Sequence, residues 1–382
     1  MNSMDKKIRL LQVIPRLDVG GAETGCKDIA KFVANQSYFS AILCSGGEQI
    51  KKIDQSKVKI FRFPVQSKNP FIIFLNIFII LFIVIFYKIN IIHVRSRAPA
   101  WSCYFASKIL KISLVSTFHG TYNFSNSLKK FYNSVMLRGD VVIAGSKFIF
   151  DHIKINYNYK KTISFIPRGI DTNFFSPKNP KVEQSNIVRS RWDVLNSDFI
   201  ILLPGRLTFW KGQFFFLNTL LFLKQEKLLN NIKAIIIGDD QGRTEYKEYL
   251  LNFIRHHQLD NDVKIISHEV SMPSAYNACD LVLSASIEPE AFGRVAVEAQ
   301  AMQKPILASN IGGSNETIID GQTGFLFKSD DEKDLAKMII EISKKDKNFL
   351  KNLGEKGRLN VINNYTVEQM CSKTLEIYKS LV

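Results

Sequence analysis

Short apolar runs alternate with longer stretches of helical periodicity along the whole chain. Short runs rich in β-branched residues indicate strands, and the stretches between them indicate crossover helices. A first set of predicted strands covers 8–14, 39–44, 58–63, 89–94, 112–118, 140–145 and 162–167. A second set covers 199–204, 232–237, 263–267, 280–285, 305–309 and 323–327. Because strands separated by helices form parallel sheets, the pattern predicts an α/β protein with two doubly wound domains.

The polar stretch 176–186, which contains proline, asparagine and lysine, marks the expected boundary between these domains. We therefore expect a first domain at 1–178 and a second at 179–365. A last helix is expected at about 366–382, and it can cross back onto the first domain. Ser329 and Glu332 predict a capping box at the start of an earlier helix.

The run FIIFLNIFIILFIVIFY at 71–87 contains one clearly polar side chain, Asn76. As a helix it would be about 25 Å long, at the lower end of the lengths that span a membrane. A spanning helix would divide the first sheet, so it is the least favoured of three alternatives. A buried crossover helix and a helix lying in the membrane surface remain about equally open. The nearby stretch 126–139 sets Lys129 and Lys130 among apolar side chains, a pattern that suits anionic headgroups.

The net charge of +16 is concentrated in the first half, where residues 1–180 hold 26 Lys and Arg against 9 Asp and Glu. A basic surface suggests nucleic acid, an anionic membrane or an acidic substrate, and a merely solvated lysine-rich surface is the alternative. No nucleic-acid-binding motif is present, so no nucleic-acid partner is expected. The five scattered cysteines indicate reduced thiols. Residues 1–14 lack the features of a signal peptide, and none is expected.

Candidate ligand-binding residues follow the predicted strands, because ligands of open α/β sheets bind beyond the carboxyl ends of the strands. Gly20 and Gly21 follow the first strand and precede a helix expected at 22–34, where backbone amides can approach an anion. A plain tight turn explains the two glycines equally well. His119 follows another strand, and structural and catalytic roles are about equally supported for it.

In the second domain, Arg206 and Lys211 lie between a strand and a helix. Two cations at this place could hold a diphosphate, Arg through its planar fork and Lys as a point charge, unless the loop is simply solvated. Gly238 ends the next strand, where a backbone can approach a ligand closely.

The segment EPEAFGRVAVEA at 288–299 predicts a loop that turns into a helix at Arg294. Glu290 then lies in the loop and Glu298 inside the helix, and both can point toward the N-terminal mouth of the helix. Free N–H groups and the positive end of the helix dipole favour an anion there. A sugar nucleotide suits this arrangement, because its phosphates can meet the N–H groups and its hydroxyls the carboxylates.

Taken together, these segments resemble the retaining glycosyltransferases of family 4, which have the GT-B fold. The resemblance extends over essentially the whole chain and is carried by GGAE (20–23), FHG (118–120), PRGID (167–171), GRLTFWKG (205–212), GDDQGR (238–243), EPEAFGRVAVEA (288–299) and GGSNETIIDGQTGFLF (312–327). It implies two Rossmann-like domains facing a cleft, with the acceptor in the N-terminal domain and a nucleotide-sugar donor in the C-terminal domain. It also implies that the last helix crosses back to the N-terminal domain.

The resemblance also implies roles for individual residues. The implied catalytic residues are His119, Glu290, Arg206 and Lys211. The implied donor-binding residues are Gly20, Gly21, Arg206, Lys211, Gly238, Glu290, Ala291, Phe292, Gly293, Arg294 and Glu298. Arg206 and Lys211 would bind the diphosphate, Glu290 the sugar hydroxyls and Glu298 the ribose, with His119 near the anomeric centre. Family members often have Asn where this chain has Arg168, which could reach a phosphate or a charged acceptor, or remain solvated.

The chemistry implied by the resemblance is transfer with retention at the anomeric carbon and without a metal cofactor. Two cations and a helix N-terminus would stabilise the departing nucleoside diphosphate in place of a divalent ion. The leaving phosphate oxygen could itself deprotonate the acceptor. Replacing Lys211 or Glu290 with Ala is expected to abolish turnover and to leave the melting temperature nearly unchanged.

The sequence thus predicts a hexosyltransferase that takes a UDP- or GDP-sugar and a lipid-linked or envelope-glycan acceptor, such as those of lipopolysaccharide biosynthesis. Its expected place is the cytoplasmic face of the membrane, as a peripheral protein on an anionic surface. Two alternatives stay open: a GT-B nucleotide-sugar epimerase, and a non-catalytic member that binds sugar nucleotides. The basic, apolar first half speaks against the epimerase, and the intact set of charged site residues speaks against the non-catalytic member.

Overall fold

The structure, a computed structural model, describes residues 7–18, 20–122, 124, 126–179, 181–242, 244–267, 269 and 271–382. Residues 1–6, part of the stretch on which the signal-peptide prediction rests, and Arg243, the last residue of the 238–243 segment, lie outside this range. The contacts divide the chain into an N-terminal unit, Met1–Gly169 with Val367–Val382, and a C-terminal unit, Ile170–Thr366.

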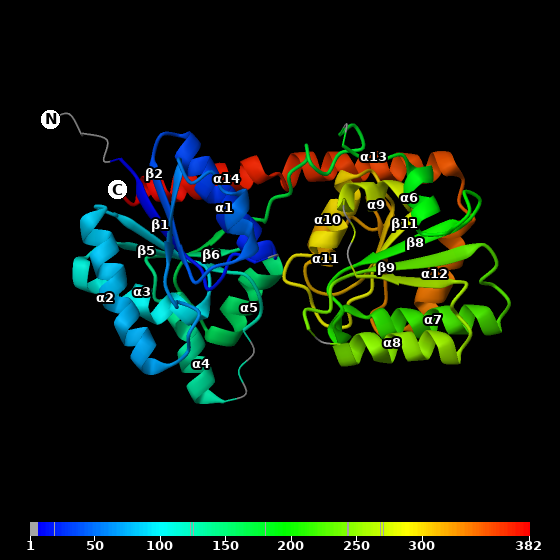
Figure 1. Cartoon of the computed structure of the whole chain (residues 1–382), viewed down its shortest axis with the longest axis horizontal. Coiled ribbons are helices and arrows are strands. Elements are labelled where there is room, and N and C mark those ends of the chain that lie inside the picture. The colour runs from blue at the N-terminus through cyan, green and yellow to red at the C-terminus, as the bar shows by residue number, and fades with distance from the viewer. Residues whose placement is uncertain are drawn as a thin grey trace. The chain divides into compact units, whose positions relative to one another are not determined.

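The N-terminal unit is built, within the described residues, on a seven-stranded parallel sheet of order β3-β2-β1-β4-β5-β6-β7 (Figure 1). Its strands are β1 (Arg9–Val13), β2 (Phe39–Cys44), β3 (Val58–Arg62), β4 (Ile91–Val94), β5 (Ser113–Phe118), β6 (Val141–Ala144) and β7 (Ile163–Phe165). Its helices are α1 (Gly21–Asn35), α2 (Pro70–Phe86), α3 (Arg97–Leu110), α4 (Ser127–Ser134), α5 (Lys147–Tyr157) and α14 (Val367–Ser380), with 3₁₀ turns η1 (Glu48–Lys52) and η2 (Val135–Leu137). The strand order reverses between β1 and β4, so the topological switch point lies there.

The C-terminal unit is built, over the part of the chain that the structure describes, on a six-stranded parallel sheet of order β10-β9-β8-β11-β12-β13. Its strands are β8 (Phe199–Pro204), β9 (Ile232–Ile237), β10 (Val263–Ile266), β11 (Leu281–Ser284), β12 (Ile306–Ser309) and β13 (Phe325–Phe327). Its helices are α6 (Ser185–Arg191), α7 (Gln213–Gln225), α8 (Thr244–His256), α9 (Met272–Ala278), α10 (Arg294–Ala301), α11 (Ser314–Thr317), α12 (Glu332–Ser343) and α13 (Lys347–Asn364), with the 3₁₀ turn η3 (Phe209–Lys211). Here the order reverses between β8 and β11.

Every predicted strand is present, which confirms the α/β class and the two doubly wound units. The strands were legible because parallel strands covered by helices on both faces are buried on both faces and read as continuous apolar runs. In β8, for example, the five residues after Phe199 are all buried. All five cysteines are buried free thiols, as predicted.

The chain enters the C-terminal unit earlier than the polar stretch 176–186 suggested. Ile170 already donates its N–H to the carbonyl of Tyr365 at 2.8 Å. Phe175 is buried in the core of the C-terminal unit, and Arg358 donates to the carbonyl of Thr172 at 3.1 Å. Within 176–186, the described residues after Ser176 are exposed or only partly buried, which fits their polar character, and the division of the chain falls after Gly169.

The last helix, α14, belongs to the N-terminal unit, as expected. Met370, Cys371, Leu375 and Tyr378 are buried in one core with side chains of β1 and α1. The Tyr378 hydroxyl lies 2.5 Å from Nδ1 of the fully buried His93 on β4. Burial, together with the nearby Arg95, holds the pKa of His93 well below its usual value of 6.5. The imidazole is therefore neutral where the helix docks.

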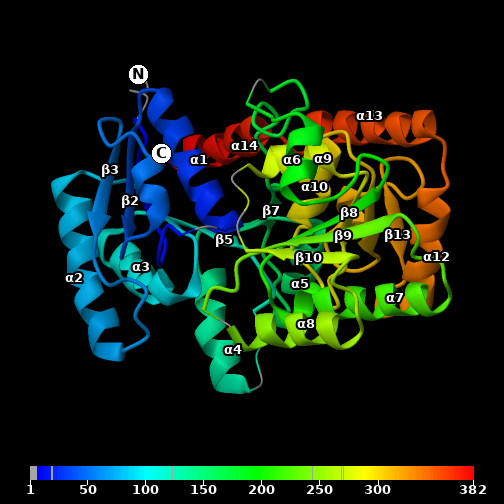
Figure 2. The ribbon, with the colours of Figure 1, turned by 45° about the vertical axis from the view of Figure 1, so that its right-hand side comes forward.

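The apolar run of the sequence forms α2, which packs along α3 (Figures 1 and 2). The helix is only partly buried. Asn76, Ile80, Ile83 and Val84 are its buried residues. The other side of the helix is apolar and exposed, at Phe71, Phe74, Leu75, Phe78, Phe82, Ile85 and Phe86. The alternative of a fully buried crossover helix is therefore wrong. Among the described residues, no helix combines the length and the apolar character needed to cross a membrane.

The predicted capping box at Ser329 is also wrong. Helix α12 begins at Glu332, and its N-cap is Asp331, whose side chain accepts a hydrogen bond from the N–H of Asp334. Aspartate is as good an N-cap residue as serine, and Asp331 lies directly before the first residue of the helix.

Candidate functional site

The site in the C-terminal unit begins in the loop between β8 and α7, which carries Arg206 and Lys211. Gly238, at the end of β9, lets this loop come close, because a Cβ there would lie 1.9 Å from the carbonyl oxygen of Gly205. The fully buried Gln213 donates from Nε2 to the carbonyl of Arg206 at 2.9 Å. The loop is thus held on both sides, while the Arg206 side chain is exposed and reaches Oε1 of Gln241 at 3.5 Å.

Lys211 and Glu290 form an ion pair at the carboxyl ends of β8 and β11, which are neighbours in the sheet. The Lys211 ammonium lies 2.7 Å from Oε1 of Glu290, and the two side chains are 13% and 10% exposed. The Ser286 hydroxyl donates to the same oxygen at 2.6 Å. Burial alone would raise the pKa of Glu290, but Lys211 and the neighbouring serine hydroxyls outweigh it and lower the pKa below 4.5. Glu290 is therefore a carboxylate at neutral pH.

The loop that carries Glu290 rests on a pair of glycines after β12. The N–H of Gly313 donates to the carbonyl of Glu290 at 2.8 Å. A Cβ on Gly313 would lie 2.4 Å from the backbone of Phe292, so only glycine allows this approach. The loop ends at Gly293, the N-cap of α10, in the left-handed conformation. The first amides of α10, which begins at Arg294, have no carbonyl partner within the helix and are available to an anion.

Glu298 lies one turn inside α10 and is held by two donors, one on each oxygen. Arg294 donates from Nε to Oε1 at 2.6 Å, and the hydroxyl of the buried Tyr276 donates to Oε2 at 2.8 Å. Each carboxylate oxygen has a second lone pair, so both can still accept hydrogen bonds from a ligand hydroxyl.

In the N-terminal unit, the structure brings together Gly21, His119 and Arg168. Arg168 donates from Nη2 to the carbonyl of His119 at 2.6 Å and lies 3.1 Å from its Nδ1. A Cβ on Gly21 would lie 2.7 Å from Nη1 of Arg168, so the glycine makes room for the guanidinium. Arg168 thus contacts both the glycine turn after β1 and the loop after β5.

These contacts determine the state of the His119 imidazole. Burial lowers its pKa well below 6.5, and the charge of Arg168 adds to the effect, so the ring is neutral. A guanidinium can only donate, so Nδ1 accepts and the proton is on Nε2. Within the described part of the chain, the shielded Nε2 has no hydrogen-bond partner. His119 can therefore donate a hydrogen bond from Nε2 to a ligand.

The candidate residues thus gather in two places. Arg206, Lys211, Gly238, Glu290, Ala291, Phe292, Gly293, Arg294 and Glu298 belong to the C-terminal unit, and Gly20, Gly21 and His119 belong to the N-terminal unit. Among the residues that the structure describes, no group of three or more His, Cys, Asp or Glu side chains is placed to hold a metal ion.

Sequence reasoning missed Ser286 and Tyr276, and it gave Arg168 no definite role. Ser286 lies four residues before Glu290, directly after a strand, and its position could have suggested a site residue. Tyr276 lies on α9 and reaches Glu298 only through the fold, so no local pattern pointed to it. Arg168 was noticed as a departure from the family, but its contact with His119 joins positions 49 residues apart.

Two doubly wound units, with glycine- and cation-bearing loops at the carboxyl ends of their strands, define an α/β architecture that is typical of proteins binding phosphate-bearing ligands. Residues 186–360 match the family described as glycosyl transferases group 1, and residues 19–174 match glycosyltransferase family 4. A glycosyltransferase of Rickettsia africae with a solved structure is 36% identical, with a TM-score of 0.89 and coverage of 98% of this chain and 99% of that chain. The chain therefore belongs to the GT-B glycosyltransferases of group 1 and family 4.

Two further relatives add detail about the family. The structure of HepE from Anabaena in complex with UDP-glucose is 24% identical over 98% of this chain and 100% of that chain, with a TM-score of 0.84, and supports the fold. The capsular polysaccharide biosynthesis glycosyltransferase CapM of Staphylococcus aureus is 25% identical over 214 residues. That match covers 56% of this chain and 53% of CapM, so the chain spans about half the length of this relative.

Proposed function

We propose that this protein transfers a hexosyl group, with retention at the anomeric carbon, from a UDP- or GDP-sugar to a lipid-linked or envelope-glycan acceptor at the cytoplasmic face of the membrane. The C-terminal unit would bind the donor and the N-terminal unit the acceptor. The observation that carries the proposal is the ion pair of Lys211 and Glu290, 2.7 Å apart, beside the N-terminus of α10.

The proposed role of the cations is to stabilise the negative charge that develops on the departing diphosphate. Lys211 is held by Glu290, and Arg206 projects from the same loop into solvent, where it can close on a phosphate. The amides of Gly293 and Arg294 add fixed dipoles of the same sign. Preorganised donors of this kind stabilise a developing anion without reorganisation, so we propose that the transfer needs no divalent ion.

The carboxylates would recognise hydroxyl groups of the donor. Glu290 is ionised, so it can accept hydrogen bonds from the sugar. Glu298 is held by Tyr276 and Arg294 with lone pairs to spare, which suits the two hydroxyls of a ribose. His119, protonated on Nε2, would donate a hydrogen bond to substrate rather than act as a base. This supports the proposal that the leaving phosphate oxygen takes the acceptor proton.

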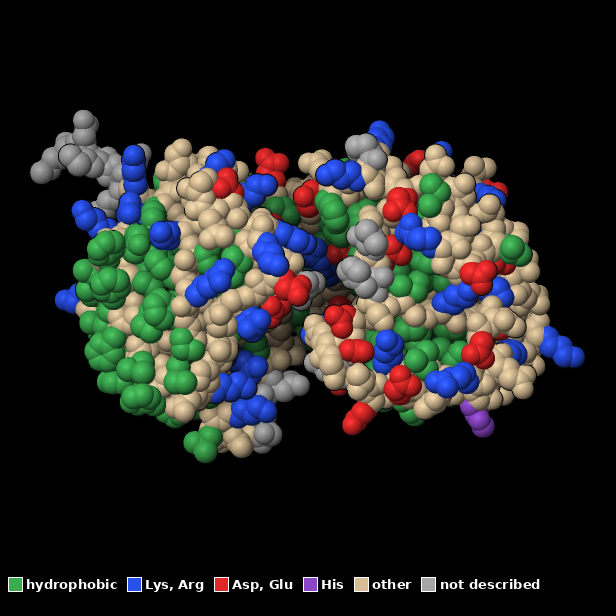
Figure 3. Space-filling view, viewed as in Figure 1, with side chains coloured by type: hydrophobic (Ala, Val, Ile, Leu, Met, Phe, Trp, Pro, Cys, Tyr) green, Lys and Arg blue, Asp and Glu red, His purple; other side chains and the backbone are tan. Residues whose placement is uncertain are grey.

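The proposed membrane face is the exposed side of α2. Phe78 and Phe82 on it are 55% and 65% exposed, and Phe105 and Ile109 of the neighbouring α3 are exposed as well. Figure 3 shows apolar side chains gathered over α2 with Lys and Arg side chains at the margins of this area. An apolar face with a basic surround suits an anionic leaflet, which takes the rings among its acyl chains and attracts the cations.

A panel of UDP- and GDP-sugars, incubated with the protein and a membrane lipid extract, tests the reaction. We expect release of the free nucleoside diphosphate only when both a matching sugar nucleotide and the extract are present, at an unchanged rate with EDTA. The glycosidic proton coupling of the product should show the same anomeric configuration as the donor. Interconversion of the sugar nucleotide without release of nucleoside diphosphate would instead identify an epimerase.

Sedimentation with liposomes tests the membrane face. The protein should sediment with phosphatidylglycerol vesicles at low salt and be released at high salt. Phe78→Ser with Phe82→Ser should abolish sedimentation and leave the melting temperature unchanged, because both rings are mostly exposed. Phe349→Ser, which removes an exposed ring from the C-terminal unit, is the matched control. Sedimentation of the double variant at the wild-type level would rule out α2 as the membrane face.

A further inference from the structure

The N-terminal unit contains a cavity of about 810 Å³, and none of the candidate site residues described above lines it. Three loops at the carboxyl edge of the sheet form it: Lys68 comes from the loop after β3, Ser96 and Arg97 follow β4, and Thr121 follows β5. Helix α4 completes the wall. Thr121 lies two residues after His119, so the cavity is at the same edge of the sheet as the imidazole.

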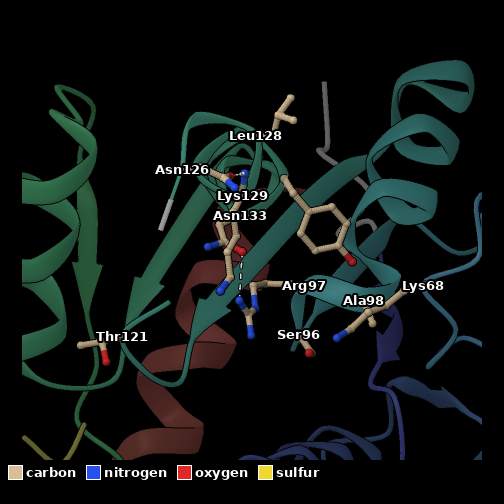
Figure 4. A pocket seen from close by; sticks show the side chains of 10 residues that line it. Lys68, Ser96, Arg97, Ala98, Thr121, Asn126, Leu128, Lys129 and Asn133 are labelled. Carbon is tan, nitrogen blue, oxygen red and sulfur yellow. Dashed lines mark hydrogen bonds between the residues drawn. The ribbon is translucent and has the colours of Figure 1, made fainter. Parts of the chain in front are cut away.

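The wall of the cavity is cationic. Lys68, Arg97 and Lys129 line it, and none of the described residues that line it carries a carboxylate. In Figure 4, Lys68, Ser96 and Arg97 come from one side of the cavity, and Asn126, Lys129 and Asn133 of the α4 segment come from the other. Three cations without a counter-charge in one cavity indicate an anionic ligand.

Arg97 is already fixed in place. Its Nη1 donates to Oδ1 of the fully buried Asn133 at 2.9 Å, and its guanidinium lies 4.3 Å from the ring centroid of Tyr122. These contacts hold the planar fork and leave further N–H donors for a ligand. Little side-chain entropy is then lost when an anion binds.

Tyr132 supplies an independent indication of a ligand. Its hydroxyl is shielded from solvent and, among the residues that the structure describes, has no hydrogen-bond partner, although the side chain lines the cavity. Shielded hydroxyls are nearly always paired, because an unpaired one is not compensated for its lost hydration. A small shift of the side chain toward the cavity that it lines would bring this hydroxyl to a ligand oxygen.

Exposed apolar side chains lie beside the cations. Leu128 lines the cavity and is 81% exposed, and Phe131 lies one turn further along α4. Lys68 is two residues before α2, whose Phe71 begins the exposed apolar side of that helix. A ligand in the cavity therefore meets cations inside it and an apolar surface next to it.

We propose that this cavity binds the phosphate or diphosphate of an acceptor in which that group joins a sugar to a long hydrocarbon chain. The inference rests on the proposed function, since it names the acceptor class of the same enzyme. Lys68, Arg97 and Lys129 neutralise the phosphates, and the Tyr132 hydroxyl donates to a phosphate oxygen. The hydrocarbon chain continues along the apolar side chains of α2 and α4 into the membrane.

The test compares two kinds of vesicle with the full-length protein. One kind is phosphatidylcholine containing a small fraction of a long-chain prenyl diphosphate, and the other is phosphatidylcholine with phosphatidylglycerol at the same total charge. Lys68→Gln with Lys129→Gln should bind the diphosphate vesicles about 30-fold to 100-fold more weakly, because each charge-assisted contact contributes about tenfold. The loss of affinity for the phosphatidylglycerol vesicles should be smaller by at least about threefold, because these vesicles offer the two lysines only a diffuse surface charge and the apolar face of α2 is intact.

Lys57→Gln with Lys160→Gln is the matched control. Both lysines are exposed and precede β3 and β7, so they lie at the opposite edge of the sheet. Their replacement removes the same charge and should leave both affinities within about threefold of wild type. Inorganic pyrophosphate should bind at least about tenfold more weakly than the lipid diphosphate, because it lacks the hydrocarbon contact.

Three outcomes would overturn the inference: equal losses on both kinds of vesicle, no loss on the diphosphate vesicles, or pyrophosphate binding as tight as that of the lipid. The last result would assign the cavity to a soluble phosphate compound. Failure of the proposed function looks different, because the selective loss on diphosphate vesicles would persist while no sugar nucleotide supported transfer. An unchanged thermal shift with the donor nucleotide would demonstrate that the double variant is folded.

Discussion

Replacing Lys211 with Ala removes the cation from the buried ion pair and leaves Glu290 without its principal partner. The two side chains are 13% and 10% exposed, so water can replace little of the lost interaction. Breaking such a pair by removing one partner costs about 3–5 kcal/mol. Because the Ser286 hydroxyl still donates to Glu290, we expect a loss of unfolding free energy at the lower end of this range, about 3 kcal/mol. For a unit of this size that corresponds to roughly 6–12 °C in Tm.

This expectation differs from the one drawn from sequence, in which the Tm was to stay nearly unchanged. The sequence placed both side chains in an open ligand site, and the structure joins them in a pair that also holds the loop. Loss of activity in Lys211→Ala therefore has two causes, a missing phosphate contact and a displaced carboxylate. Adding Glu290→Gln separates the loss of stability from the loss of activity, because the double variant no longer contains a buried unpaired charge but still lacks both site residues.

The assay is thermal unfolding of the wild type, Lys211→Ala, Glu290→Gln and the double variant, together with transfer activity. We expect the double variant to recover at least half of the lost stability and none of the activity. The control is Lys264→Ala, whose ammonium lies 2.8 Å from an almost fully exposed Asp193 carboxylate. That pair is exposed and should contribute less than about 1 kcal/mol. A Tm for Lys211→Ala within about 1 °C of wild type would refute the reasoning.

The pH dependence provides a second check on the same pair. In the wild type the pKa of Glu290 is lowered in the folded state, so its contribution to stability is present above about pH 4.5 and is lost as the pH falls further. In Lys211→Ala, burial dominates and raises the pKa of Glu290. The destabilisation relative to wild type should therefore shrink as the pH falls toward 4.5, and a destabilisation that grows would contradict this assignment.

Three further predictions concern other contacts. Arg168→Asn should raise the pKa of His119, because burial and Arg168 together depress it. Without the guanidinium at Nδ1, the imidazole should populate both neutral tautomers, which ¹H–¹⁵N NMR would detect. The kcat should fall about tenfold, with little change in KM for the donor. Tyr276→Phe removes one donor from Glu298 and should weaken nucleotide binding about threefold to tenfold in calorimetry, while equal affinity would exclude a role for Glu298 in binding. The pKa of His93 is lowered in the folded state, so the free energy of unfolding should fall by up to about 1.4 kcal/mol per pH unit below pH 6.5. Denaturant titrations at several pH values should show a weaker dependence of this free energy on pH for His93→Gln.

The fold was predictable because local patterns determine its parts. A strand such as β9, with Ile235, Ile236 and Ile237, reads as apolar at every position since both faces are covered. The loops after β8 and β11 were also recognisable, because glycines and charges follow a strand end there. These patterns do not show which side chains contact one another. The pair Lys211–Glu290 and the pair His119–Arg168 each form because distant loops meet at the carboxyl edge of their own sheet.

The errors have the same origin. The run 71–87 is apolar on all sides, so periodicity could not tell which side of α2 is covered, and only its packing on α3 decides this. The described residues after Ser176 in the stretch 176–186 are exposed or partly buried, and composition cannot distinguish such a surface segment from a junction between domains. Of the cavity lined by Arg97 and Tyr132, only the basic segment 126–139 was recognisable in the sequence, because the other lining residues come from three separate segments that only the fold brings together.

The place of α14 in the core of the N-terminal unit determines the order in which the nascent protein can mature. Met370, Cys371, Leu375 and Tyr378 complete that core, and they leave the ribosome only after the whole C-terminal unit, which precedes them in the chain. The C-terminal unit is continuous from Ile170 to Thr366 and can fold as soon as it emerges. The N-terminal unit is therefore translated before the C-terminal unit but completed after it, and until α14 docks, the apolar surface that this helix covers stays exposed together with the outer side of α2.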